Sequence, residues 1–79
     1  MNEIQNEFSV FQFFSDDDYE EVCRRVNIEE AVKKAKSLTE SIGAKIGTTQ
    51  RVIITDRGDD CCFEWQFGKG IIFPDMPLN

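Results

Sequence analysis

The residues of this chain that could do chemistry are two adjacent cysteines and a cluster of aspartates, and no histidine accompanies them. Cys61 and Cys62 are candidate thiolate nucleophiles or metal ligands. Asp56, Asp59 and Asp60 are candidate oxygen ligands for a divalent cation. Without histidine the chain lacks the usual base that activates a cysteine or serine, and the commonest metal ligand. The composition therefore excludes nucleophilic enzymes of the Cys–His and Ser–His classes.

The cysteine pair is poorly arranged for either a metal or a disulfide. Neighbouring residues of a strand point to opposite faces, so Cys61 and Cys62 cannot easily bind one metal or bond to each other. Cys23 could approach one of them across a sheet, which gives three thiolates where structural zinc usually needs four ligands. We expect Cys61 to be a small core residue, Cys62 to be half-exposed, and the chain to need no cofactor. An odd, clustered set of cysteines is typical of a reducing compartment, so we expect a cytoplasmic protein.

The aspartates surround Arg57 and Gly58, a pattern typical of a hairpin turn. We expect Gly58 to supply the positive φ of that turn and the acids to keep it solvated. The alternate spacing of acids in calcium-binding loops is missing, so a divalent-ion-binding domain is only an alternative. We interpret Asp16–Asp18 in the same way, as a turn whose acids keep it solvated. If both turns lay at one end of a sheet, they would form an acidic rim.

Size and charge limit the class of protein. The chain has 79 residues and a formal net charge of −6. We expect one small domain over residues 1–79, with flexible ends at 1–6 and 75–79. A nucleic-acid-binding protein would show a strong basic face, so no nucleic-acid partner is expected. The start is neither basic nor apolar enough for a signal peptide, and no apolar run reaches the ~20 residues of a membrane span.

Hydrophobic patterning predicts an α+β fold in the order β-β-α-β-β-β, with an antiparallel β-sheet and one helix packed on one face. Tyr19–Val26 is ambiguous, because its apolar residues fit helical spacing as well as a strand that pairs back onto the first; we favour the strand. The expected elements are strands at Phe8–Phe14, Tyr19–Val26, Arg51–Thr55, Cys61–Phe67 and Ile71–Phe73, and a helix at Ile28–Ile42.

The helix has the clearest signals. Asn27 is a good N-cap and Glu30 completes a capping box, while Gly43 is placed to end the helix as the C′ residue. One apolar stripe should face the sheet on the side of Phe63, Trp65 and Phe67. The stripe consists of Ile28, Ala31, Val32, Ala35, Leu38 and Ile42.

One helix cannot cover both faces of five strands, and the first strand is apolar on both faces. Either Phe11 and Phe13, or else Phe8 and Val10, must therefore lie on the far face. Glu64 should lie in solvent; the alternative is an ion pair across strands with Arg51 or Arg57.

The segment Arg51–Asp59, in the pattern RVIITDxGD with position 57 left open, followed by Phe63-Glu64-Trp65, resembles a group of short uncharacterised bacterial proteins. The start of the helix, Glu29–Val32, shares this resemblance, which extends from about Phe8 to Pro74. The resemblance implies a compact stand-alone domain and no particular activity.

These observations predict a small non-catalytic protein-binding or regulatory domain. It would bind a protein partner or itself, in the simplest case as a homodimer through the far face or a sheet edge. One alternative is an acidic inhibitor, of the kind found in phages and mobile elements, of a host nucleic-acid-binding protein. Another is the divalent-ion-binding domain. The predicted interaction residues are Phe11, Phe13, Asp56, Asp59 and Asp60.

Overall fold

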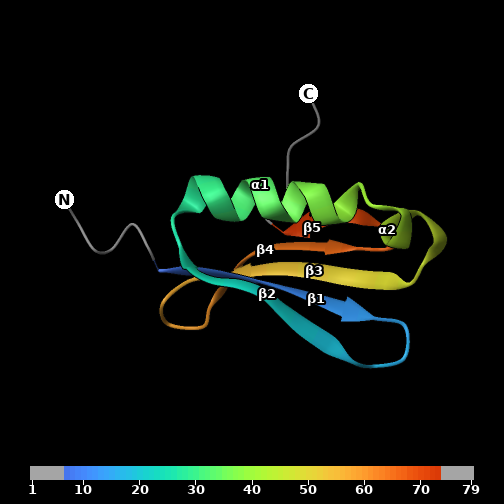
Figure 1. The fold of residues 1–79 in the computed structure, drawn as a ribbon, viewed down its shortest axis with the longest axis horizontal. Coiled ribbons are helices and arrows are strands. Elements are labelled where there is room, and N and C mark those ends of the chain that lie inside the picture. Colours follow the sequence, from blue (N-terminus) through green and yellow to red (C-terminus); the bar gives the residue numbers. More distant parts are fainter. Residues whose placement is uncertain (1–6, 74–79) are drawn as a thin grey trace.

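The computed structural model describes residues 7–73, and the flexible ends predicted at 1–6 and 75–79 lie outside that range. Five strands form one antiparallel sheet in the order β2-β1-β3-β4-β5, with two helices on one side of it (Figure 1). The elements are β1 (Phe8–Phe14), β2 (Tyr19–Val26), α1 (Ile28–Thr39), α2 (Ile42–Ile46), β3 (Thr49–Thr55), β4 (Cys61–Gln66) and β5 (Gly70–Phe73). The α+β class and the helix on one face are confirmed, and the second helix changes the order to β-β-α-α-β-β-β.

The ambiguous segment after the first turn is a strand, as favoured. Asp17 takes a positive φ of 73°, and the Asp16 carboxylate accepts a hydrogen bond from the Asp18 N–H at 3.0 Å. This tight turn reverses the chain, so that Tyr19 pairs with Phe13 at the start of an antiparallel hairpin. Pairing with β1 supplies backbone hydrogen bonds that a helix would otherwise form internally.

The start of α1 follows its capping signals. The Asn27 side chain accepts a hydrogen bond from the Glu30 N–H at 2.8 Å, which satisfies one of the free donors of the first turn. Glu29 and Glu30 lie in that turn, where negative charge favours the helix dipole. Within residues 7–73, neither helix has the length and apolar character needed to cross a membrane.

The helix prediction was wrong at its end, because α1 stops at Thr39 rather than Ile42. The Ser41 hydroxyl donates to the Leu38 carbonyl at 2.7 Å and accepts from the Ala44 N–H at 3.1 Å, so it closes one helix and caps the next. Gly43 therefore lies inside α2. A Cβ at Gly43 would be 3.0 Å from the Thr49 hydroxyl, so glycine allows α2 to lie close to β3.

The core lies between α1 and the two central strands. It consists of Val10, Ala31, Ala35, Val52 and Ile54, each at most 2% exposed. The two alanines let the helix backbone approach β1 and β3 closely.

The predicted apolar stripe of the helix is only partly buried. Ile28 and Val32 are 44% and 50% exposed, and Ile42 lies on α2. The prediction failed there because α1 sits over the centre of the sheet and not over β4. Trp65 packs against the core as expected, whereas Phe67 follows the end of β4 and is 40% exposed.

Strand register decides which residues of β1 lie on the far face. Val10 pairs with Ile54 and packs under α1, whereas Phe11 pairs with Ile53 and Phe13 with Arg51 on the opposite face. Of the two arrangements left open by the sequence, the one that exposes Phe11 and Phe13 is therefore correct.

We predict that Asn27→Ala lowers the free energy of unfolding by about 1 kcal/mol, because the Glu30 N–H loses its acceptor. Asn27→Ser should retain most of the stability, since a serine hydroxyl can accept the same bond. Urea unfolding followed by Trp65 fluorescence measures both. Equal losses in the two variants would contradict a capping role.

Candidate functional site

The sheet face opposite α1 and α2, here called the helix-free face, carries an aromatic strip made of Phe11, Phe13 and Tyr19. The ring centroids of Phe13 and Tyr19 are 5.6 Å apart and nearly stacked, and those of Phe11 and Tyr19 are 6.3 Å apart. Tyr19 is 62% exposed, and Ile53 lies beside Phe11 on the neighbouring strand. No helix among residues 7–73 covers this strip, so its rings are available to another molecule.

An ion pair borders the aromatic strip on its β4 side. Arg51 Nε donates to Glu64 Oε2 at 2.5 Å, and the Arg51 guanidinium lies 5.0 Å from the centroid of the Phe13 ring. Gln66 Nε2 donates to the same carboxylate at 3.0 Å. The prediction that Glu64 lies in solvent is therefore wrong, and the alternative, an ion pair across strands with Arg51, is correct. The hydrogen bonds from Arg51 and Gln66 lower the pKa of Glu64 below its usual range.

We predict that this pair stabilises the fold above the unfolded-state pKa of glutamate, about 4.3. The folded-state pKa is depressed, so the contribution is lost as pH falls through that lower value. Glu64→Gln should cost about 0.5–1 kcal/mol at pH 7 and less in acid. Urea unfolding across pH measures the difference. In an Arg51→Met background the same substitution should cost less; an unchanged cost would exclude the ion pair as the cause.

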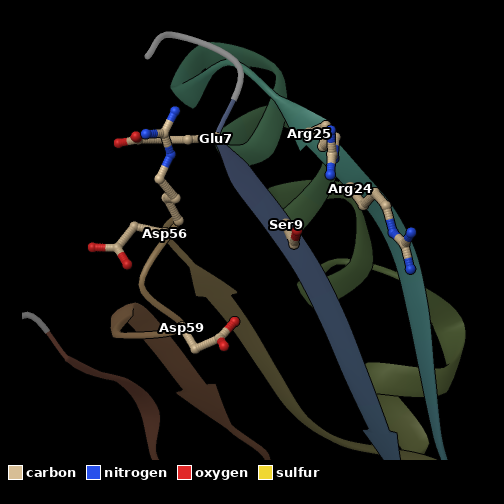
Figure 2. A pocket seen from close by; sticks show the side chains of 7 residues that line it. Glu7, Ser9, Arg24, Arg25, Asp56 and Asp59 are labelled. Carbon is tan, nitrogen blue, oxygen red and sulfur yellow. The ribbon is translucent and has the colours of Figure 1, made fainter. Parts of the chain in front are cut away.

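A charged pocket of about 700 Å³ lies on the same face, at the end of the sheet where β1 begins. Figure 2 shows side chains from β2 and from the β3–β4 turn on either side of Ser9, which lies on β1 two residues before Phe11. The pocket is lined by Glu7, Ser9, Arg24, Arg25, Asp56, Arg57 and Asp59. It therefore continues the aromatic strip along β1.

A β-bulge in β2 places two arginines in this pocket. Phe8 pairs with Val26 and Val10 with Cys23, so Arg24 and Arg25 both lie opposite Ser9. Arg25 has a positive φ of 59°, a conformation that costs a residue with a side chain more than it costs glycine.

The pocket favours neither cations nor anions by its net charge, because its lining has three arginines and three acids. Arg24 is paired with Glu21 at 2.9 Å, and the hydrogen bond raises the pKa of Arg24. Within the described chain, Arg25 makes no salt bridge. Arg57 makes none either, so the pocket offers two guanidinium groups without a salt bridge among balanced charges, at the border of the aromatic strip.

The acidic turn is built by its own backbone. The Asp56 carboxylate accepts hydrogen bonds from the N–H groups of Gly58 at 2.9 Å and Asp60 at 3.1 Å. Asp59, with a φ of 64°, takes the positive φ that we had predicted for Gly58. Aspartate tolerates this conformation because its side chain can hydrogen-bond locally. Asp56 is therefore a turn-forming residue.

The two acidic turns lie at opposite ends of the sheet. The β1–β2 turn at Asp16–Asp18 lies beside the start of β3, where the Ser15 N–H donates to the Thr48 carbonyl at 3.0 Å (Figure 1). The β3–β4 turn lies beside the start of β1, since Ser9 pairs with Thr55. They cannot form the acidic rim on which the inhibitor interpretation depended.

The cysteines are arranged for packing. Cys23 lies on β2 and Cys62 on β4, three strand spacings or about 14 Å apart. The approach of Cys23 to the cysteine pair that the sequence allowed therefore does not occur, and these thiols cannot share a metal. A register shift between Ile54 and Thr55 turns Cys62 toward the core. The prediction that Cys61 is the core residue is therefore wrong. Burial raises the pKa of the Cys23 and Cys62 thiols, which favours the unreactive protonated form. Across residues 7–73, no three cysteine, aspartate or glutamate side chains are close enough to hold a metal ion.

The predicted interaction residues divide into two groups in the structure. Phe11 and Phe13 lie together in the aromatic strip, and Asp56 and Asp59 line the charged pocket with Asp60 in the same turn. Sequence reasoning missed Tyr19, Arg24 and Arg25. The alternation of β2 could have placed Tyr19 opposite Phe13, but nothing in the sequence marks the bulge. Comparison with known protein families, curated proteins and solved structures finds no match to this chain, so function is argued from this geometry.

We predict that Arg25→Gly leaves the free energy of unfolding unchanged or raises it by up to about 1 kcal/mol, because glycine accepts the positive φ. Arg24→Gly, at the neighbouring position without positive φ, should lower it by a similar amount. Thermal unfolding followed by circular dichroism compares the two. A larger loss for Arg25→Gly than for Arg24→Gly would show that the Arg25 side chain stabilises the fold.

Proposed function

We propose that this protein is a small non-catalytic protein-binding domain and that the helix-free face is its docking surface. The observation that carries the proposal is the aromatic strip, whose three rings lie against one another on a face that α1 and α2 leave uncovered. Aromatic side chains are enriched at the energetic centres of protein interfaces, and so is arginine, here the half-exposed Arg51 that pairs with Glu64 beside the strip.

The face also has the charge arrangement of an interface. The acidic turn Asp16–Asp18 and Glu21, which pairs with Phe11, flank Tyr19 at one end, and the balanced charged pocket lies at the other. The chain as a whole carries a net charge of −6. The partner that fits is a protein surface with an apolar centre and basic side chains placed opposite the Asp16–Asp18 turn.

The side chains of the chain support a binding role over a catalytic one. Partial burial raises the pKa of the Cys23 and Cys62 thiols, and the Asp56 carboxylate is occupied by backbone donors of its own turn. The chain has no histidine. Contact surface, rather than a reactive group, is therefore what the helix-free face offers.

The proposal predicts that one protein retained from a lysate by the immobilised full chain is lost with Phe11→Asp/Phe13→Asp. The same protein should be released as salt rises from about 0.05 to 0.5 M, because the acidic flank is screened. Tyr19→Ala, at an exposed position that leaves the fold intact, should weaken binding at least tenfold, as loss of an interface aromatic does.

Lys33→Ala on the exposed side of α1 is the matched control and should retain the partner. Retention of the same protein by the Phe11→Asp/Phe13→Asp variant would contradict the proposal. So would a fall in molar mass by light scattering on this double substitution, because the strip would then belong to a contact between two copies.

A further inference from the structure

The side of the sheet that carries the helices is itself only partly covered. Packed helices lie about 8–10 Å apart and strands about 4.8 Å apart, so one helix covers about two strands. α1 packs through Ala31 and Ala35 over β1 and β3. The same side of β4 and β5 is left with no helix of its own among residues 7–73.

This gap is an apolar groove of about 530 Å³ between α1 and β5. Val32 forms its wall on α1, Phe63 and Trp65 form its floor on β4, and Ile71 forms the wall on β5. Val32 and Ile71 are each 50% exposed. One end of the groove is lined by Thr39 and Glu40, the residues that lead into α2.

The same side of the molecule carries an apolar projection, formed by Ile42 and Ile46 on α2. They are 76% and 69% exposed, more than any other large apolar residue within 7–73. Residues four apart lie on one side of a helix, so the two side chains project together. α2 is held in place by the Ser41 cap and ends at Gly47, whose φ is 95°. The projection is therefore presented by a fixed element.

The groove and the projection match in polarity. They belong to the same side of the sheet, because α1, which lines the groove, and α2, which carries the projection, lie on that side (Figure 1). Lys45 lies between the two isoleucines, and Glu40 lies at the nearby end of the groove. A contact that seats the isoleucines in a groove can therefore also bring a lysine to a carboxylate.

We propose that a second copy of this chain fills the groove, with Ile42 and Ile46 of each copy entering the groove of the other. Groove and projection lie on one side of the molecule, so a two-fold axis makes the same contact twice and closes the assembly at a dimer. Each copy buries its most exposed apolar residues and covers the open side of β4 and β5. The aromatic strips of both copies lie on the outer faces, so the dimer offers two docking surfaces.

Sedimentation velocity and light scattering on the full chain test this assembly. Wild type should change from monomer to dimer as concentration rises into the micromolar range, and its Trp65 emission should shift to shorter wavelength over the same range. Ile42→Lys/Ile46→Lys, here called the projection variant, and Val32→Glu/Ile71→Glu, here called the groove variant, should each raise the dimer dissociation constant at least about 30-fold. All four positions are exposed, so the folded monomer should persist by circular dichroism.

Mixing the two variants gives the decisive measurement. A mixed dimer keeps one intact contact, the isoleucines of the groove variant in the groove of the projection variant. The mixture should therefore form more dimer than either variant alone. Ile72→Lys, at another exposed apolar position on β5 that does not line the groove, should leave the dimer intact.

Three results would overturn the proposal: a wild type that stays monomeric into the millimolar range, a mixture that forms no more dimer than its components, or loss of the dimer in Ile72→Lys. Loss of the dimer in Ile72→Lys would assign the contact between copies to the β5 edge. Growth beyond a dimer would overturn the two-fold arrangement in favour of a head-to-tail one. Phe11→Asp/Phe13→Asp should leave the dimer unchanged, so failure of this proposal is distinguishable from failure of the proposed docking surface.

Discussion

The packing of one short helix on a five-stranded sheet is the constraint from which the other surfaces follow. Ala31 and Ala35 bring α1 close to Val10, Val52 and Ile54, and this contact forms the central core cluster among residues 7–73. A helix of 12 residues cannot extend that core to the outer strands or to the opposite face. The fold therefore ends with two apolar surfaces that its own described elements do not cover.

The two uncovered surfaces differ in character. The helix-free face is a flat array of rings beside an ion pair, a chemistry suited to contact with another protein surface. The groove is concave, apolar and bordered by a helix, and it lies next to a projection of matching polarity. We propose the first surface for a different molecule and the second for a copy of the same chain. A single small domain can in this way combine assembly and recognition on opposite sides of one sheet.

The polar features of the chain mostly serve the backbone. Asn27, Ser41 and Asp56 each accept backbone hydrogen bonds at a helix start or turn, and Asp17 and Asp59 take positive φ values. This accounts for the acidic clusters without any ligand. Arg25 is different, because it takes a positive φ within a strand and its side chain lies in a pocket beside the aromatic strip. The bulge that places it is an irregularity of the β1–β2 pairing that local turn formation does not explain.

Local chemistry determined the strands, the start of α1 and the antiparallel class, because period-two patterns, caps and turn residues act over a few positions. The same patterns required an uncovered apolar face and limited it to two sets of residues. Only the tertiary structure decided that Phe11 and Phe13 occupy that face, that Ser41 divides the helix, and that Cys62 rather than Cys61 packs inward. Those outcomes depend on strand register, bulges and the strands over which α1 sits. These in turn are set by contacts between residues far apart in the chain, which no local pattern encodes.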